Sequence, residues 1–210
     1  MMNIIYYSLK CLEERKMPRV SREQTEHNRA AIEEVSSRLF REQGFKGVSV
    51  ADLMAAAGLT HGGFYGHFAS KDALAAVACG KAFEQSAQRW EARIATHADP
   101  RAAFQAIAEA YLAPASRDHA GRGCPAAALA GDVAREAPDA PVRAVYLAGV
   151  KDLLAKLAEL SGAPDPAARS DAAMVQLATM AGALLLARAT HGDPLSDHML
   201  AAVRASLNHT

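Results

Sequence analysis

The stretch GLTHGGFYGHFASKDAL, from Gly58 to Leu74, places Gly62, Gly63 and Gly66 close together between segments of helical character. Each glycine inside a helix costs about 0.5–1 kcal/mol relative to alanine, so this stretch should melt unless something outside it compensates. The surrounding sequence has to supply that compensation, and also a reason for small residues at these positions.

The composition is that of an ordinary soluble globular protein. The chain has 210 residues, 50% of them hydrophobic, and 23 Lys and Arg residues balance 23 Asp and Glu residues. This length fits one or two domains. A net charge of zero gives no global attraction to nucleic acid, so a DNA-binding function has to rest on local residues.

Cysteine usage and apolar runs favour a cytoplasmic protein. Cys11, Cys79 and Cys124 match no zinc-binding spacing, and we expect them to be reduced thiols. Apolar runs such as 181–187 are far shorter than the roughly 20 residues that cross a bilayer, so no transmembrane helix is expected. The histidines form no HExxH pair, and we expect neither a metal nor a cofactor.

The first residues do not look like a secretory signal, because residues 1–16 have no basic leading region and no small-residue cleavage site. Met17 opens a polar segment and suits a second start site. We hypothesise that residues 1–16 are an upstream extension of the reading frame that the native protein lacks, and we assign residues 1–19 to an N-terminal extension that precedes the first domain.

Beyond Thr25 the pattern is helical almost throughout. Ile32, Val35, Leu39 and Phe40 form one apolar stripe that Gly44 should end. A second helix should begin at a capping box of Ser49 and Asp52 and end at Gly58. Thr60 can cap the glycine-rich segment, and Ser70 can cap a long helix that runs to Ile94.

Five further helices should begin at prolines in the first helical turn. These prolines are Pro100, Pro125, Pro141, Pro166 and Pro194. No segment alternates with a period of two for long enough to form a sheet. The sequence therefore predicts an all-α fold of about nine helices.

The short turn AGLT, residues 57–60, is typical of a helix-turn-helix, whose second helix enters the DNA major groove. A groove about 12 Å wide admits a helix of about 10–12 Å only closely, so glycines suit the contact face. Phe64 and Phe68 should anchor this weak helix against Leu39, Phe40, Leu53 and Leu74. Tyr65 and His67 then point elsewhere, and Lys71 can meet a phosphate.

The segment FREQGFKGVSVADLMAAAGLTHGGFYGHFASKDALAAV, residues 40–77, resembles the N-terminal DNA-binding domain of the TetR family of bacterial transcriptional repressors. The likeness spans roughly residues 26–80. It implies a helix-turn-helix DNA-binding domain over 20–80 and an effector-binding and dimerisation domain over 81–210. The candidate operator contacts that it implies are Ser49, Thr60, His61, Gly62, Gly63, Tyr65, His67 and Lys71.

The resemblance also implies a homodimer that reads a roughly palindromic operator. The last two helices of each subunit, about 166–190 and 194–207, would form a four-helix interface. The candidate interface residues are Met174, Leu177, Ala178, Ala181, Leu184 and Leu185. The alternative is that this wide apolar face is simply intramolecular core.

Family members usually bind a small molecule in the C-terminal domain, so the resemblance implies an effector. Trp90, Phe104, Tyr111 and Tyr146 are candidates for lining its cavity, with ordinary core packing as the alternative.

Cys124 is a candidate sensor of electrophiles or oxidants. It precedes Pro125, which marks a helix start, and Arg122 is close in sequence. A helix N-terminus and a nearby cation both favour a thiolate. We hypothesise that modification of Cys124 releases DNA, and the alternative is a small, buried, inert residue.

The competing class of function is a small hydrolase-like enzyme. GVSVA around Ser49 faintly resembles a nucleophile elbow and HGGF at His61 an oxyanion motif, but the surroundings are helical and no complete GxSxG exists. Arg188 lies in an apolar helix, where we expect it to extend to solvent, with pairing across an interface as the alternative. The sequence favours a non-enzymatic, ligand-responsive repressor.

Overall fold

The computed structural model describes residues 22–208, and this part of the chain contains helices and no strand, which confirms the all-α prediction. The predicted N-terminal extension lies outside the described residues. The α-helices are α1 (Arg22–Gly47), α2 (Val50–Ala56), α3 (Lys71–Ile94), α4 (Pro100–Tyr111), α5 (Pro114–Asp118), α6 (Pro125–Ala128), α7 (Ala130–Arg135), α8 (Pro141–Leu160), α9 (Pro166–Ala189) and α10 (Pro194–Asn208). Two 3₁₀-helices are η1 (His61–Gly66) and η2 (Ala120–Arg122).

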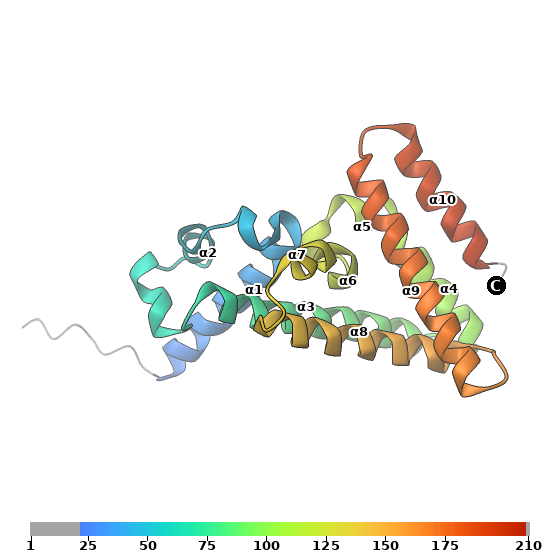
Figure 1. Ribbon diagram of the computed structural model, residues 1–210, viewed down its shortest axis with the longest axis horizontal. Helices are drawn as coiled ribbons and strands as arrows, with labels where there is room; N and C mark the ends of the chain where they lie inside the picture. Colours follow the sequence, from blue (N-terminus) through green and yellow to red (C-terminus); the bar gives the residue numbers. More distant parts are fainter. Residues whose placement is uncertain (1–21, 209–210) are drawn as a thin grey trace, which may run out of the picture.

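The helices form an elongated molecule (Figure 1). The α2 and η1 segment lies at one end, the α9–α10 pair lies at the other, and α3 runs between them beside α8. The two ends are therefore joined by a continuous helix. The domain boundary expected at residue 80 lies inside α3, which packs against α1 as well as against α4 and α8.

The predicted signals at the N-terminal end are present. Gly44 has φ 74° and breaks the regular geometry of α1, and Gly58 has φ 72° just beyond α2, so both adopt the left-handed backbone that favours glycine. Ser49 and Asp52 form the reciprocal capping box of α2, and the Ser70 side chain caps α3.

The glycine-rich segment differs in detail from the prediction. It forms the 3₁₀-helix η1, and Thr60 holds the N-cap position without a side-chain hydrogen bond to the helix. A segment this short and this rich in glycine forms few side-chain contacts along a helix, and short connecting segments often adopt the tighter 3₁₀ geometry instead of an α-helix.

Beyond residue 95, α4, α6, α8, α9 and α10 begin at the five predicted prolines. The sequence reasoning missed α5, η2 and α7, which are at most six residues long. Elements this short carry no periodic apolar stripe, so hydrophobic spacing cannot reveal them.

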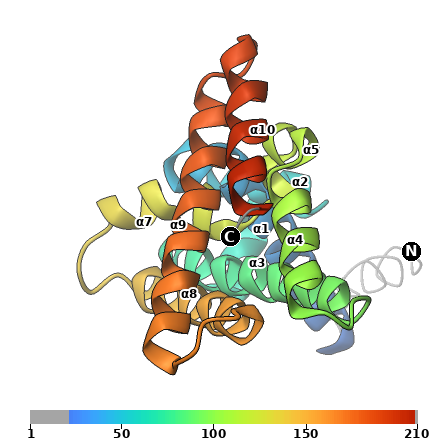
Figure 2. The same ribbon diagram turned by 90° about the vertical axis from the view of Figure 1, so that its right-hand side faces the viewer.

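The helices α9 and α10 form an antiparallel pair at the end of the molecule (Figure 2). By length and composition alone, α9 could cross a membrane, although apolar helices of soluble proteins satisfy the same test. The prediction of no transmembrane helix considered only uninterrupted apolar runs, and it therefore did not detect the high mean hydropathy of α9. One side of α9 packs on its own chain, with Ala173, Met180 and Ala187 buried.

Candidate nucleic-acid interface and regulatory cavity

Two phenylalanines hold η1 onto the body of the protein. Phe64 is fully buried and Phe68 nearly so, and their ring centroids lie 6.0 Å apart. They belong to the same buried cluster as Phe40, Leu53 and Leu74. The predicted anchoring is confirmed, and it explains how a glycine-rich turn stays folded.

Arg29 of α1 provides a further anchor that the sequence reasoning missed. Its Nη1 donates to the His67 carbonyl oxygen at 2.6 Å, and its guanidinium carbon lies 4.4 Å from the centroid of the Phe68 ring. A cation at that distance from an aromatic face is attracted to it. The end of η1 is thus fixed from α1.

Most of the predicted DNA contacts face solvent. Tyr65 is 70% exposed, which is unusual for so large a hydrophobic side chain. The other exposed candidates are Ser49, Thr60, His61, Gly62 and Gly63. Lys71 and His67 are half-buried, and His67 Nδ1 is buried without a hydrogen-bond partner.

The hydroxyl of Ser49 already has a partner. Its Oγ donates to Asp52 Oδ2 at 2.6 Å, and Asp52 Oδ2 also accepts from the Ser49 backbone N–H at 2.9 Å. Both hydrogen bonds lower the pKa of the Asp52 carboxyl. The capping box therefore fixes the start of α2 and presents Ser49 at the surface.

The glycines of η1 are not required by the fold. An added Cβ at Gly62 or Gly66 would meet nothing within 4 Å, and at Gly63 only Met54 Cε at 3.6 Å and Thr60 Oγ1 at 3.9 Å, which are ordinary contacts. None of the three has a positive φ. Their small size therefore serves neither backbone geometry nor internal packing.

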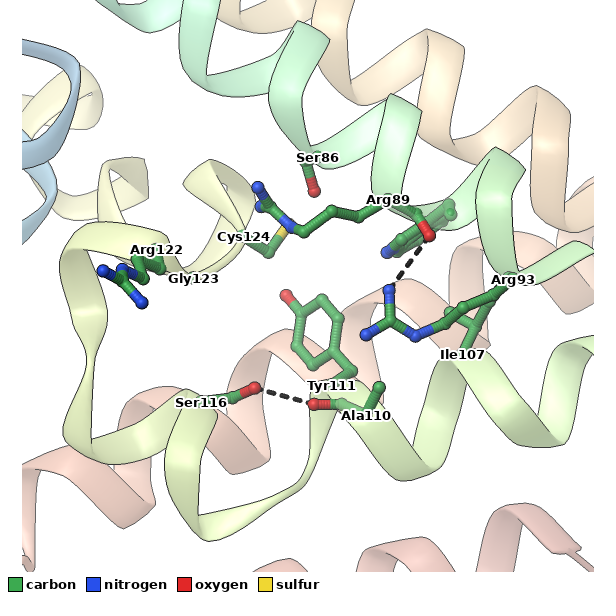
Figure 3. A pocket seen from close by; sticks show the side chains of 11 residues that line it. Ser86, Arg89, Arg93, Ile107, Ala110, Tyr111, Ser116, Arg122, Gly123 and Cys124 are labelled. Carbon is green, nitrogen blue, oxygen red and sulfur yellow. Dashed lines mark hydrogen bonds between the residues drawn. The ribbon is translucent and has the colours of Figure 1, made fainter. Parts of the chain in front are cut away.

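A small cavity lies between α3, α4 and the segment that contains η2 and Cys124 (Figure 3). Its volume is about 60 Å³. Three predicted effector residues, Trp90, Tyr111 and Cys124, line it together, and the others present are Ser86, Arg89, Arg93, Ile107, Ala110, Ser116, Arg122 and Gly123.

Two predicted effector residues lie elsewhere. Phe104 is buried core and is not among the residues that line this cavity. Tyr146 packs edge-to-face against Phe83, and its hydroxyl donates to the Ala126 carbonyl at 2.8 Å. Phe104 therefore packs as core in this structure, whereas Tyr146 lines a separate surface pocket between α7 and α8.

Cys124 is buried and occupies the N-cap position of α6, so part of its predicted setting is present. The cation beside its thiol is Arg89, from α3, whereas the Arg122 head group points away from the sulfur (Figure 3). Sequence proximity suggested Arg122, and only the tertiary fold brings Arg89 close. Burial lowers the pKa of Arg89.

Two arginines, the buried Arg41 and the half-buried Arg188, connect the wall of this cavity to both ends of the molecule. From α1, Arg41 Nη1 donates to the Gly123 carbonyl at 3.0 Å, while its Nη2 donates to Gln85 Oε1 at 2.9 Å. From α9, Arg188 Nη2 donates to the Ser116 carbonyl at 2.8 Å. Burial lowers the pKa of both guanidinium groups, that of Arg41 to about 10.

The expectation that Arg188 extends to solvent is therefore wrong. Its guanidinium reaches inward to the backbone of residues 116–123, and a Cβ added at Gly123 would lie 2.5 Å from Arg188 Nη2. The glycine makes room for the arginine, so the two residues fit each other.

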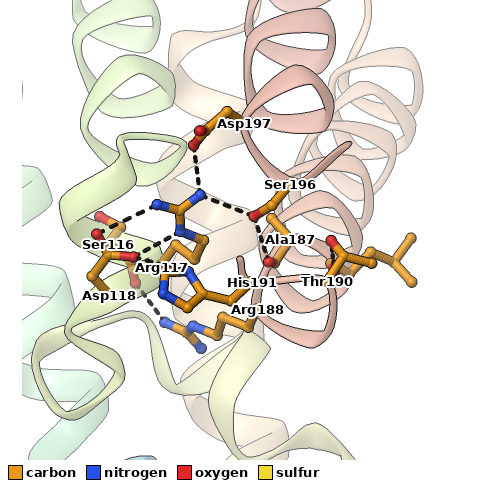
Figure 4. Close-up of polar contacts among 10 residues, drawn as sticks. Ser116, Arg117, Asp118, Ala187, Arg188, Thr190, His191, Ser196 and Asp197 are labelled. Atoms are coloured by element: carbon orange, nitrogen blue, oxygen red, sulfur yellow. Dashed lines mark hydrogen bonds and ion pairs between the residues drawn. The ribbon is translucent and has the colours of Figure 1, made fainter. Parts of the chain in front are cut away.

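A polar network beside Arg188 joins α5 to the turn between α9 and α10 (Figure 4). Arg117 Nη1 donates to Ser196 Oγ at 2.9 Å and to Asp197 Oδ1 at 2.5 Å. Its Nε donates to Asp118 Oδ1 at 2.7 Å, which lowers the pKa of that carboxyl. Arg188 of α9 and Arg117 of α5 thus connect the segment beside the cavity to α9 and α10.

Comparison with protein families decides what this architecture is. Residues 32–78 match the family of "Bacterial regulatory proteins, tetR family". Residues 32–78 are a TetR-family DNA-binding domain. A comparison with functionally curated proteins gave no significant match.

Solved structures of TetR-family regulators share the fold. A TetR transcriptional regulator from Chloroflexus aurantiacus J-10-FL is 25% identical, with a TM-score of 0.72 over 89% of this chain and 95% of that one. The reduced form of Escherichia coli NemR is 20% identical, with a TM-score of 0.73 over 87% and 96%. AibR in complex with isovaleryl coenzyme A and operator DNA is 18% identical, with a TM-score of 0.60 over 85% and 97%.

In this chain the predicted interface residues of α9 divide into two groups. Leu177 and Leu184 are buried in the chain's own core. Met174, Ala178 and Leu185 are exposed, and Ala181 is half-buried. Further exposed apolar side chains on the pair, which the sequence reasoning did not name, are Val175, Leu186 and Leu195.

Proposed function

We propose that the protein is a cytoplasmic transcriptional repressor that binds a palindromic operator as a homodimer and is released by a small molecule or by modification of Cys124. The operator contacts are Ser49, Thr60, His61, Gly62, Gly63, Tyr65, His67 and Lys71. The dimer uses the outer face of α9 and α10, and the effector enters the cavity lined by Trp90, Tyr111 and Cys124.

The observation that carries the DNA-binding proposal is the set of glycines in η1. Gly62 and Gly66 have free space around the missing Cβ and no positive φ, so the fold alone does not require them. DNA bound closely against η1 would require small residues at these positions, because the major groove admits a helical segment only with little clearance. The exposed Tyr65 beside them supplies a hydroxyl for phosphate or base contacts.

The connection between cavity and DNA-binding end supports release by an effector. The Gly123 carbonyl accepts from Arg41 of α1, and the adjacent Cys124 lines the cavity. A ligand that displaces Cys124 would also move the neighbouring Gly123 carbonyl, to which Arg41 holds α1. The movement would reach the DNA-binding end because α1 shares a buried core with α2 and η1. AibR, which shares the fold, was solved with both an acyl coenzyme A and operator DNA.

Binding to the DNA that flanks the protein's own gene tests the proposal. A repressor should bind one palindromic site there, with an affinity that falls steeply as salt rises. Gly62→Leu should weaken binding at least tenfold, because the side chain occupies the space left for DNA. Gly162→Leu is the matched control, since its Cβ also meets nothing within 4 Å. Equal operator affinity of both variants would exclude a close-packed groove.

The thiol part of the proposal has its own test. An electrophile should release the wild-type protein from operator DNA and leave Cys124→Ser bound. A full response of Cys124→Ser would assign the effect to another residue.

A further inference from the structure

The cavity beside Cys124 is lined by cations and by no acidic residue. Arg89, Arg93 and Arg122 contribute to its wall. Arg93 Nη1 donates to the Arg89 carbonyl at 2.9 Å, Arg122 points away, and the Arg89 guanidinium lies beside the Cys124 sulfur (Figure 3). Among the described residues, the Arg89 side chain has no hydrogen bond to an acceptor and no ion pair, although it is half-buried.

A second polar group in the cavity also lacks a partner. Tyr111 is 5% exposed, its ring lies against Trp90, and its hydroxyl has no hydrogen bond of normal geometry. The hydroxyl points into the space bounded by Ser86, Arg89 and the sulfur of Cys124 (Figure 3). In the part of the chain that the structure describes, the Cys124 thiol is the only side chain beside this hydroxyl that affects its pKa through a hydrogen bond, and a buried hydroxyl without a good acceptor is costly. An acceptor with negative charge would satisfy the hydroxyl and would also pair with the Arg89 guanidinium.

A carboxylate meets this requirement. Its two oxygens can accept from the Arg89 guanidinium and the Tyr111 hydroxyl, and charge-assisted bonds of this kind are the stronger ones. Trp90 and Ile107 contribute apolar surface to the same wall, which can contact a short alkyl chain. This apolar surface beside Arg89 favours an alkyl monoanion over inorganic phosphate.

The volume limits the size of the ligand. About 10–15 Å³ of such space holds one water, so the cavity of about 60 Å³ accommodates roughly four to six non-hydrogen atoms. We propose that this cavity binds a carboxylic acid of three to four carbons as its carboxylate, with Arg89 as the counter-ion and Tyr111 as the hydrogen-bond donor. The role of this ligand as the effector rests on the proposed function, whereas its binding does not.

Thermal unfolding of the full chain with butyrate tests the proposal. At constant ionic strength and neutral pH, butyrate should raise Tm saturably, by about 5–10 °C at a hundred times its Kd. Butyramide has the same shape without the charge and should give no shift. Arg89→Gln should abolish the butyrate shift, and Arg101→Gln, an exposed arginine on α4, should retain it.

A second variant covers the case in which Arg89→Gln does not fold. Tyr111→Phe removes only the unpaired hydroxyl, so Tm without ligand should not fall, and butyrate affinity should drop about fivefold to tenfold. Equal shifts with butyrate and butyramide would show an apolar cavity and overturn the proposal. An equal shift with inorganic phosphate would show a general anion site and overturn it as well.

The two proposals can fail separately. Saturable butyrate binding without release of operator DNA would retain the carboxylate site and remove its effector role. Absence of any specific operator would refute the repressor and leave the butyrate result unaffected. Operator release by butyrate but not by butyramide, lost in Arg89→Gln, would support both.

Discussion

Cys79 and Cys124 are both buried free thiols, yet their surroundings differ. Cys124 lines the cavity next to the Arg89 guanidinium, whereas Cys79 packs inside α3 among apolar residues. Burial raises the pKa of the Cys79 thiol to about 12. At pH 8 only about one molecule in 10⁴ then carries a Cys79 thiolate, which is the reactive form.

Iodoacetamide should therefore distinguish these cysteines in the native protein. In a Cys11→Ser background at pH 8, we expect Cys124 to be alkylated at least tenfold faster than Cys79, because cavity access and thiolate fraction both disfavour Cys79. Mass spectrometry of the digested protein over time measures both rates. Comparable rates would mean that the cavity gives no access to Cys124.

Asp52 makes the stability of the α2 start dependent on pH. The hydrogen bonds from Ser49 lower its folded-state pKa below the usual value near 3.8. A carboxyl with a depressed folded-state pKa contributes its full stabilisation above the unfolded-state pKa, and this is lost as pH falls through the folded-state pKa.

Asp52→Asn should accordingly be less stable than the wild type at pH 7, and the difference should shrink between pH 5 and pH 3. Urea midpoints of both proteins over this range measure the effect. A difference that stays constant with pH would mean that the carboxylate charge contributes nothing to the cap.

Two arginines, Arg41 and Arg188, add hydrogen bonds between helices to the apolar contacts of the core. Arg41 of α1 donates to the Gly123 carbonyl, to the Ser37 carbonyl and to Gln85, and it is 5% exposed. Removing a buried hydrogen-bonding group strands its partners, at a cost of about 1–3 kcal/mol.

Arg41→Met should reduce the free energy of unfolding by that amount and should also weaken the response of operator binding to any effector of the cavity. Arg38→Met, on the same helix, removes an exposed ion pair with Glu42 and should change stability by less than about 0.5 kcal/mol. Urea unfolding and operator titration give both quantities. An effector response equal to wild type in Arg41→Met would show that α1 receives the signal by another route.

Sequence reasoning predicted the longer elements well because each carries its own signal. Caps, left-handed glycines and proline starts are local, so Ser49, Gly44 and Pro166 could be interpreted without knowing the fold. Residues 112–135 carry few such signals, and of their short helices only α6 was predicted, from Pro125. Arg29 and Arg188 act through partners distant in sequence, and only the fold brings Arg89 beside Cys124, because no local pattern specifies where a long side chain ends.

The candidate sites divide in the same way. The anchoring of η1 followed from two phenylalanines four residues apart, which share a face of any helix. The meeting of Trp90, Tyr111 and Cys124 depends on how α3, α4 and residues 123–124 cross, and aromatic spacing alone also selected Phe104 and Tyr146. Long-range packing decided which of these residues share a cavity.

The whole molecule has the DNA-binding segment with α2 at one end and the α9–α10 pair at the other (Figure 1). On α9, Met174, Val175, Leu185 and Leu186 are each at least half exposed. Monomeric proteins rarely expose contiguous apolar surface of this kind, and such patches mark interaction sites. In the proposed homodimer, a second copy of the chain covers this face through a symmetric contact and places two copies of η1 on one DNA duplex.

Charge placed on this face should therefore separate the subunits. Val175 is 66% exposed and Leu185 50% exposed, so Val175→Glu with Leu185→Glu should leave the monomer folded while burying two carboxylates in the interface of a dimer. Light scattering after size exclusion should show wild type at twice 22.2 kDa and this variant at 22.2 kDa. Leu147→Glu, on α8 and 54% exposed, is the matched control and should remain dimeric.

The double variant should also bind operator DNA more than a hundredfold more weakly, because each separated subunit contacts only a half-site. A monomeric wild type would refute the proposed homodimer outright.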